Sequence, residues 1–389
     1  MSAQPVYTQI RQLLKQHISA KVDESTLEHL TVLVVGILHG EHATPARMAQ
    51  ALETLGLSGA KAESIERRIR RIENDAEISA ATCFHPWARQ RLLLGRPREL
   101  LLILDPTTQE DRLVMVSVAV WYRGRALPLA WATWPANTPL AGERFWARIA
   151  ALLDVVVGLL PCRVPVTWLA DRAFGCPAFI DLVTAHGWHY LVRVQAQTVW
   201  RDRLGCEGQV GQLIRLPGQR AKRHGYLFKK RGWRLASLLV YWGRRHADPL
   251  CLVTDRPAGW YLVPLYRHRY PIEATFRDYK SAGWHWEQGQ VTNPQHIERL
   301  LVGMALASWI TLMVGTQVAA ELLAQPPTGR RHTRPPEAKH SLFRLGLQRL
   351  HTAIQGNARL ACPWLLSDWE APDWQTQIGN HHANAFIWA

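Results

Sequence analysis

The chain of 389 residues lacks several motifs by which metal proteins and nucleotide-dependent enzymes are often recognised. Its six cysteines are scattered without a Cys-x-x-Cys pair, which argues against a zinc site and favours reduced thiols in a cytoplasm. The 17 histidines include no His-Glu-x-x-His arrangement, and no glycine-rich phosphate-binding loop is present, so ATP is not expected as a substrate. The first residues do not combine a basic segment with an apolar run, so we expect no signal peptide.

Acidic residues are few relative to basic ones. The 31 Asp and Glu stand against 46 Lys and Arg, which gives a net charge of +15 and a pI of about 10.0. This balance predicts a polyanionic partner, nucleic acid before membrane, and disfavours a glycosidase that works with two carboxylates. The length predicts two or three domains with a large core.

One uncharged run, residues 300–320, is long enough to span a bilayer. It contains polar residues such as Ser308 and Thr311, and no second apolar span stands beside it. An apolar helix of this kind is also what the centre of a large soluble domain requires. We therefore predict a buried core helix and no membrane partner.

Strands and helices alternate in the pattern from residue 98 onward. Strands are predicted at 100–104, 113–122, 126–134, 164–169 and 188–194, with helices at 142–160 and 177–186. The first of these apolar strands ends in Asp105, and the fourth leads into Asp171. An aspartate after a strand often only caps a turn. Two such acids, together with a third in the segment described next, favour a catalytic triad over that alternative.

The third acid, Glu273, lies among basic residues in the segment 266–280. A proline suits the first turn of a helix there, and Glu273, Phe276, Arg277 and Lys280 follow the i, i+3, i+4, i+7 spacing of one helix face. A solvated charged face is the simplest alternative. One carboxylate among several bases, however, suits a metal ion and a phosphate held side by side.

The spacing in this segment carries a resemblance. Tyr266, Arg269, Glu273 and Lys280 are separated by two, three and six residues, which resembles the Tyr-Arg-Glu-Lys signature of bacterial insertion-sequence transposases. The subgroup is the insertion sequence four family, cut-and-paste enzymes of the DDE type. The segment from Asp171 to Gly175 also resembles the family's second acidic motif, which usually has Gly where Ala173 stands. The resemblance implies an α/β fold: an RNase H-like core with a mixed five-stranded sheet, interrupted by a basic β-rich insertion, plus an N-terminal helical domain.

The family's chemistry is two-metal phosphoryl transfer on DNA. The resemblance implies that Asp105, Asp171 and Glu273 are catalytic and hold two Mg²⁺ (or Mn²⁺) ions, since hard cations take carboxylate oxygens. It further implies a DNA phosphate site formed by Tyr266, Arg269, Lys280 and Arg277. The partners would be double-stranded DNA at transposon ends and target, with a homodimer when two ends are synapsed, in a bacterial cytoplasm at the nucleoid.

Five regions are predicted. Residues 1–80 form a helical N-terminal DNA-binding domain, in which a basic helix at 63–72 resembles a helix-turn-helix reader, with a simple helical bundle as the alternative. The core occupies 98–195 and 249–320, with an insertion at 196–248 and a helical and tail region at 321–389. A proline- and arginine-rich linker is expected at 325–340.

The insertion carries 12 Lys and Arg against 3 Asp and Glu, a net charge of +9. We expect it to grip DNA, with Lys229, Lys230 and Arg231 among the contacts. The resemblance implies that cleavage passes through a DNA hairpin with a flipped base held by a tryptophan. Trp242 and Trp233 are the candidates, and packing within a small β subdomain is the alternative for both.

Two other functions stay open from the sequence. One is an RNase H-like nuclease that cuts without strand transfer. The other is a DNA-binding protein derived from a transposase and no longer catalytic, which the intact acids and signature residues disfavour.

Overall fold

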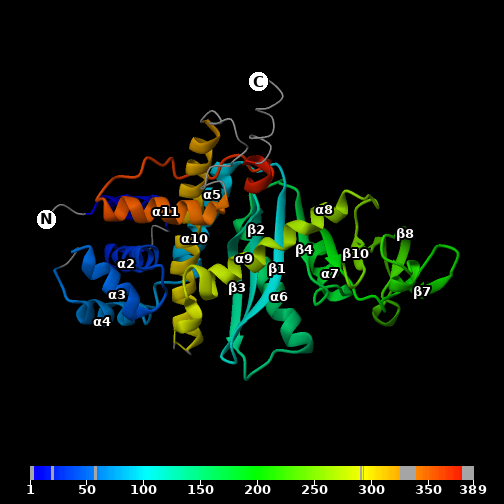
Figure 1. The fold of residues 1–389 in the computed structure, drawn as a ribbon. Helices are drawn as coiled ribbons and strands as arrows, with labels where there is room; N and C mark the ends of the chain where they lie inside the picture. Colours follow the sequence, from blue (N-terminus) through cyan, green and yellow to red (C-terminus); the bar gives the residue numbers. More distant parts are fainter. Residues whose placement is uncertain are drawn as a thin grey trace, which may run out of the picture.

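The computed structural model describes residues 4–18, 22–56, 59–289, 291, 293–324 and 339–378, and its architecture is mixed α/β. One large sheet runs through the middle of the molecule. N-terminal helices lie at one end, and an antiparallel extension of the sheet lies at the other (Figure 1).

The sheet has ten strands within the described residues, in the order β3-β2-β1-β4-β5-β10-β9-β8-β6-β7. Their bounds are β1 Leu100–Gln109, β2 Leu113–Tyr122, β3 Arg125–Pro135, β4 Val166–Ala170, β5 His189–Arg193, β6 Val199–Arg201, β7 Glu207–Gln209, β8 Arg220–Leu227, β9 Arg234–Tyr241 and β10 Leu250–Thr254. Only the β1–β4 and β4–β5 pairs are parallel, and the other pairs are antiparallel. The sheet is therefore mixed, as predicted.

The five predicted core strands are all present and stand next to one another as β3-β2-β1-β4-β5. α6 (Gly142–Leu159) joins β3 to β4, and α7 (Pro177–Ala185) joins β4 to β5. Both helices form where the apolar periodicity predicts them. Parallel pairing of β4 with β1 and β5 requires such crossover helices.

The core strands belong to a larger sheet. β10 pairs with the edge of β5, and β9, β8, β6 and β7 continue from it, so the insertion extends the core sheet. The two longest strands of the insertion are β8 (Arg220–Leu227) and β9 (Arg234–Tyr241), which pair with each other.

β1 also runs further than the sequence suggests. The apolar run ends at Leu104, yet the strand continues through Asp105 and Pro106 to Gln109, paired with β2. Only the parallel pairing with β4 stops at Leu104, opposite Ala170. Beyond that point β1 pairs with β2 alone. A proline is tolerated in such an edge position, because a backbone N–H is not needed on the side that has no partner strand.

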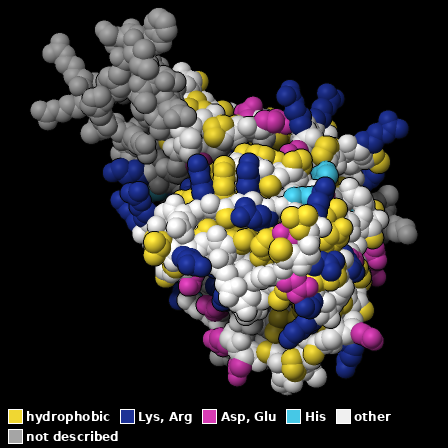
Figure 2. All heavy atoms as spheres, turned by 90° about the vertical axis from the view of Figure 1, so that its right-hand side faces the viewer, with side chains coloured by type: hydrophobic (Ala, Val, Ile, Leu, Met, Phe, Trp, Pro, Cys, Tyr) yellow, Lys and Arg dark blue, Asp and Glu magenta, His cyan; other side chains and the backbone are white. Residues whose placement is uncertain are grey.

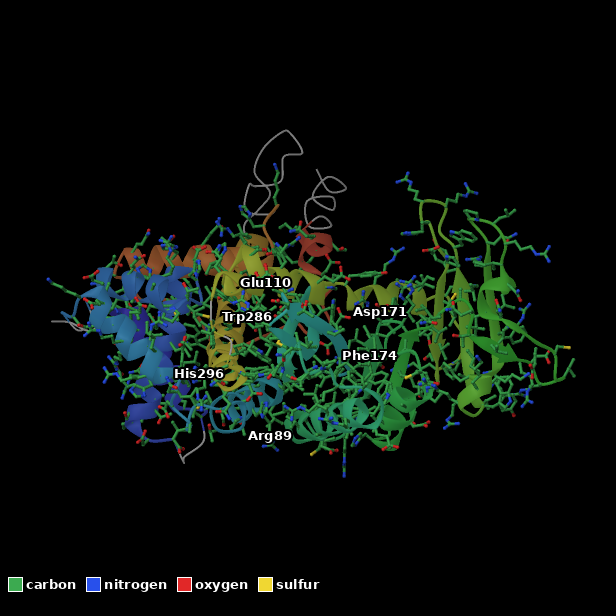
Figure 3. All side chains as sticks on the ribbon, turned by 90° about the horizontal axis from the view of Figure 1, so that it is seen from below. Arg89, Glu110, Asp171, Phe174, Trp286 and His296 are labelled. Carbon is green, nitrogen blue, oxygen red and sulfur yellow. The ribbon has the colours of Figure 1, made fainter. Side chains whose placement is uncertain are left out.

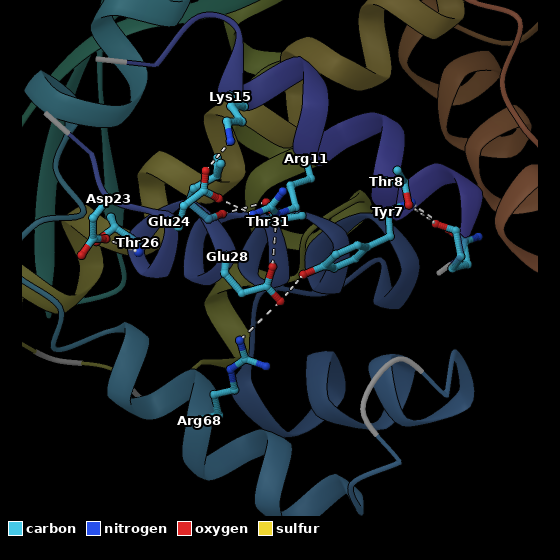
Figure 4. Close-up of polar contacts among 12 residues, drawn as sticks. Tyr7, Thr8, Arg11, Lys15, Asp23, Glu24, Thr26, Glu28, Thr31 and Arg68 are labelled. Carbon is cyan, nitrogen blue, oxygen red and sulfur yellow. Dashed lines mark hydrogen bonds and ion pairs between the residues drawn. The ribbon is translucent and has the colours of Figure 1, made fainter. Parts of the chain in front are cut away.

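The described N-terminal region is helical: α1 Pro5–Lys15, α2 Glu24–Gly40, α3 Pro45–Thr54 and α4 Ala62–Ile72, followed by a π-helical turn η1 (Ala80–Phe84) and α5 (His85–Gly95). Glu28 on α2 ties three of these helices together (Figure 4). It accepts a hydrogen bond of 2.6 Å from the Tyr7 hydroxyl on α1 and forms ion pairs with Arg11 at 3.4 Å and Arg68 at 3.5 Å.

α4 does not present a free row of arginines. Arg68 pairs with Glu28, and Arg67 and Arg70 pair with glutamates one turn earlier on α4 itself. Among the described residues only Arg71 of the four lacks an ion pair. The helix-turn-helix hypothesis for this region remains a prediction.

α10 (Pro294–Ala324) contains the apolar run and is the central helix of the fold. It packs against β3 of the sheet, against α2 and against α11 (Leu342–Gln355). By length and composition this helix alone, within the described residues, could cross a membrane, but 89% of its apolar window is buried inside the protein. The prediction of a buried core helix is confirmed. Most of the predicted linker, residues 325–338, lies outside the described residues, as do residues 379–389 of the tail.

Candidate active site

The first two acids meet where β1 and β4 run side by side. Leu104 on β1 and Ala170 on β4 are partners in the parallel register, and Asp105 and Asp171 are the residues that follow them. Asp105 is buried, with 9% of its surface exposed, while Asp171 opens the turn after β4. Figure 3 shows Asp171 between the core and the basic extension of the sheet.

The third acid comes from a helical segment that crosses β1 and β3 (Figure 1). It consists of α8 (Leu262–Tyr266), a 3-10 turn η4 (Arg267–Arg269), α9 (Pro271–Arg277) and a π-helical turn η5 (Asp278–Ala282). The proline therefore begins α9 without interrupting the helical path. The 3-10 turn absorbs the backbone change, because Pro271 needs no N–H at that position.

Arg269 joins the acids. Its Nη1 lies 3.2 Å from Asp105 Oδ1 and its Nη2 donates to Glu273 Oε1 at 2.9 Å. Its side chain is only 8% exposed, so the guanidinium is held within the protein. The Tyr266 hydroxyl donates to the carbonyl of Ala170 at 3.3 Å, which ties the helical segment to the end of β4.

The charges around Asp105 act on its protonation. Burial raises the pKa of Asp105, Arg269 lowers it, and the charges of Asp171 and Glu273 raise it, so that the pKa is about 6. Burial alone would lower the pKa of Arg269, but Tyr266 and the three carboxylates outweigh it and raise that pKa. One cation thus compensates three negative charges incompletely, as expected for a site that can accept more positive charge.

The described residues contain no group of three His, Cys, Asp or Glu side chains close enough to hold a metal ion. The position among the acids is taken by the Arg269 guanidinium. Carboxylate oxygens are the ligands that a hard divalent cation prefers, and Asp105 and Glu273 both contact Arg269, while Asp171 follows the strand next to Asp105. A cation would bind there only after Arg269 moved.

Among the described residues, neither Lys280 nor Arg277 forms an ion pair or hydrogen bond with Asp105, Asp171 or Glu273. Lys280 lies in the π-helical turn and its Nζ is 3.3 Å from Glu287 Oε1. The helix face predicted for Glu273, Phe276 and Arg277 lies within the α-helix α9. Lys280 does not continue that face, because it lies in the π turn, where the angular step between residues differs.

Beside Asp171 lies a cavity of about 540 Å³. It is lined by the segment after Asp171, including Arg172, and by the turn between β8 and β9 with Lys229, Lys230 and Arg231. Lys229 pairs with Glu207 at 2.5 Å, whereas Lys230 and Arg231 have no carboxylate within ion-pair distance in the part of the chain that the structure describes. Figure 2, which faces this end of the molecule, shows Lys and Arg side chains protruding from its surface.

Neither predicted tryptophan lines this cavity. Trp233 lies under the Arg201 guanidinium at 4.5 Å, and Trp242 donates its indole N–H to the carbonyl of His246 at 2.9 Å. The aromatic lining residues are Trp146 on α6 and Phe228, whose φ of 73° is rare for a bulky residue. The sequence offered one signal for Phe228, its position directly before three bases.

Part of the chain is similar in sequence to a known protein family. Residues 147–310 match the family described as Transposase DDE domain, a stretch that includes Asp171 and Glu273 and begins after Asp105. This similarity covers 164 of the 389 residues of the chain. No curated protein matches the chain.

Two solved structures are similar at low identity. A piggyBac transposase synaptic complex with hairpin DNA is 11% identical, with 99% of this chain and 85% of that chain covered and a TM-score of 0.49. Human ENDOV is 15% identical, with 51% of this chain and 90% of that chain covered and a TM-score of 0.26. Both likenesses are too distant to carry an argument. The insertion sequence four subgroup and the bacterial origin stay predictions.

Proposed function

We propose that the protein is a DNA transposase that binds the ends of an insertion sequence and catalyses divalent-cation-dependent strand cleavage and strand transfer. The observation that carries this proposal is the contact of Asp105 and Glu273 with the buried Arg269 guanidinium, with Asp171 at the end of the neighbouring parallel strand. Asp171 and Glu273 also lie within the region that matches the transposase family.

Each residue has a role in the proposed reaction. Two Mg²⁺ or Mn²⁺ ions bound to the carboxylates would supply an activated attacking oxygen and stabilise the leaving oxygen. Asp105, Asp171 and Glu273 would hold these ions through their carboxylate oxygens. Arg269 would exchange its carboxylate partners for a phosphate of the cut strand, since a guanidinium binds either anion with paired hydrogen bonds. Tyr266 holds the helical segment against β4 during this exchange.

DNA would cross from the acids to the basic extension. Lys230 and Arg231, which lack ion-pair partners in the described residues, stand across the cavity from Arg172 and would bind phosphates. Lys280 could join them only by leaving Glu287. We expect the cut to pass through a hairpin. The flipped base would lie on Trp233 or Trp242 as the family resemblance implies, or on Trp146 and Phe228, which line the cavity.

The remaining features of the proposal follow from the sequence resemblance. β1 to β5, with the order β3-β2-β1-β4-β5, would form an RNase H-like core. Membership of the insertion sequence four family, a homodimer at synapsed ends and a bacterial cytoplasmic location at the nucleoid belong to the same proposal.

The test is incubation of the protein with duplexes carrying the ends of its own element, Mg²⁺ and a supercoiled target plasmid. A transposase gives both excised ends and plasmid-joined product. Cleavage without joining would make the protein a nuclease of the same fold. Binding of the ends without any cleavage would make it a non-catalytic DNA-binding protein and would refute the proposal.

A further inference from the structure

Arg269 occupies the position between two of the carboxylates that the proposed function assigns to metal binding. Its Nη1 lies 3.2 Å from Asp105 Oδ1, and its Nη2 donates to Glu273 Oε1 at 2.9 Å. A Mg²⁺ ion would bind carboxylate oxygens at about 2.0–2.1 Å. An ion held by these two carboxylates would lie close to the guanidinium, and the two positive charges would repel each other. Arg269 and a divalent ion therefore compete for one place.

The two contacts of Arg269 differ in their exposure to water. The side chains of Asp105 and Arg269 are 13% and 8% exposed, so their contact lies within the protein, whereas the Glu273 side chain is 59% exposed. A charge interaction inside the protein is screened far less than one in water. An ion that entered the free protein would have to separate Arg269 from Asp105, and it would offer the guanidinium no new partner. The free protein therefore resists metal binding at this position.

The surface side of Arg269 offers a second position for its guanidinium. The Arg269 Cζ lies 5.1 Å from the ring centroid of Tyr270, which is 45% exposed. Arg269 Nε has no hydrogen-bond partner among the described residues, so the present position leaves one of its donors unused. Tyr270 and Glu273 are thus the exposed neighbours of Arg269, and Asp105 is the buried one. An anion that arrives from solvent meets the guanidinium on the side of Tyr270 and Glu273.

A DNA phosphate is suited to replace the carboxylates as the partner of Arg269. A guanidinium binds a phosphate with paired hydrogen bonds, as it binds a carboxylate. Once a phosphate holds Arg269, Asp105 and Glu273 lose their cation. Together with Asp171, which follows the neighbouring strand, they then carry negative charge that another cation can offset. DNA binding and metal binding consequently favour each other.

We propose that Arg269 keeps divalent metal ions out of the free protein and admits them when a DNA phosphate draws its guanidinium away from Asp105 and Glu273. Each of the two ligands then raises the affinity for the other by the same factor. The inference rests on the proposed function, because it takes the acids as the metal ligands. It adds that the metal-bound state is rare without DNA, so the free protein does not carry a ready metal centre.

Binding of Mn²⁺ to the full chain, measured by electron paramagnetic resonance, tests this coupling. The hexaaqua ion gives a signal that protein-bound Mn²⁺ loses, so the measurement does not depend on DNA cleavage. Without DNA, we expect Arg269→Ala and Arg269→Gln to bind Mn²⁺ about tenfold or more tightly than wild type, because they remove the competing charge. With a duplex that carries an element end, wild type should gain more affinity for Mn²⁺ than either variant does, after subtraction of the ions that the duplex binds alone.

Two controls locate the effect, and a third measurement checks folding. Arg267→Ala removes the same charge from an exposed position on the same 3-10 turn, and it should bind Mn²⁺ as wild type does. Asp105→Asn, added to Arg269→Gln, should abolish the gain in affinity, because it removes a ligand of the ion. Thermal melting without metal shows whether each variant is folded, and Arg269→Gln keeps an N–H donor at the position where Arg269→Ala has none.

Two results would overturn the inference alone. They are Mn²⁺ binding by DNA-free wild type as tight as that by Arg269→Gln, and a gain in affinity that survives Asp105→Asn. If none of the proteins binds Mn²⁺, with DNA present or absent, the metal site itself is refuted, and the proposed function fails together with the inference.

Discussion

Replacing Asp105 with asparagine should make the protein more stable at neutral pH. The carboxyl is buried and its pKa rises from 3.8 to about 6 on folding. A rise of about two in pKa corresponds to about 3 kcal/mol of differential free energy. The folded protein therefore bears a cost of about 3 kcal/mol at pH 8, where Asp105 is ionised.

The pH dependence has a definite sign. Between pH 3.8 and about 6 the folded state binds more protons than the unfolded state, so this group's contribution to stability falls as pH rises through that window. Asp105→Asn cannot ionise and escapes this loss, although Arg269 then keeps only Glu273 as a contact partner. We expect the variant to exceed wild type by about 1–3 kcal/mol at pH 8 and to match it near pH 4.

Urea denaturation from pH 4 to pH 8, followed by tryptophan fluorescence with divalent cations chelated, measures this difference. Asp111→Asn is the matched control, because it removes the same charge from an exposed turn beside β1 and should show no such widening. A variant no more stable than wild type at pH 8, or a gap of equal size at pH 4, would refute the assignment of Asp105 as an under-compensated buried acid.

Three further predictions concern the framework and the DNA surface. Arg125 and Asp278 form a buried ion pair between β3 and the π turn. Arg125→Ala should therefore lower the free energy of unfolding by about 3–5 kcal/mol in urea titrations, and a loss smaller than about 1 kcal/mol would mean that Asp278 finds another partner. Lys230→Ala and Arg231→Ala should each reduce the slope of log affinity against log salt by about 1 in DNA binding, and unchanged slopes would place DNA elsewhere. Gly315→Ala should lower the melting temperature, because a Cβ there would lie 1.9 Å from the backbone of α11. Such overpacking costs about 1–3 kcal/mol or more, and an unchanged melting temperature would contradict the close contact between the two helices.

The core strands and the pairing of two acids were predictable because both depend on local patterns. Apolar runs mark strands that are buried on both faces. Residues that follow neighbouring parallel strands meet at one edge of the sheet, which brings Asp105 beside Asp171. The extension of β1 through Pro106 was not predictable from the sequence, because it depends on the pairing of this part of β1 with β2.

The position of Lys280 shows a second limit. A spacing of seven residues places side chains on one face only if every turn is α-helical, and the π turn at Asp278–Ala282 breaks that assumption. The spacing of four residues is compatible with the contact between Arg269 and Glu273, but it gives no sign of the contact between Lys280 and Glu287.

The most direct test of the central claim is cleavage of an end-bearing duplex by the three isosteric variants Asp105→Asn, Asp171→Asn and Glu273→Gln, with Mg²⁺ and matched DNA-binding measurements. The account predicts that each variant binds the ends as wild type does and that none of them cuts. Cleavage by any one of them at a rate near that of wild type would remove that residue from the site and contradict the three-acid assignment.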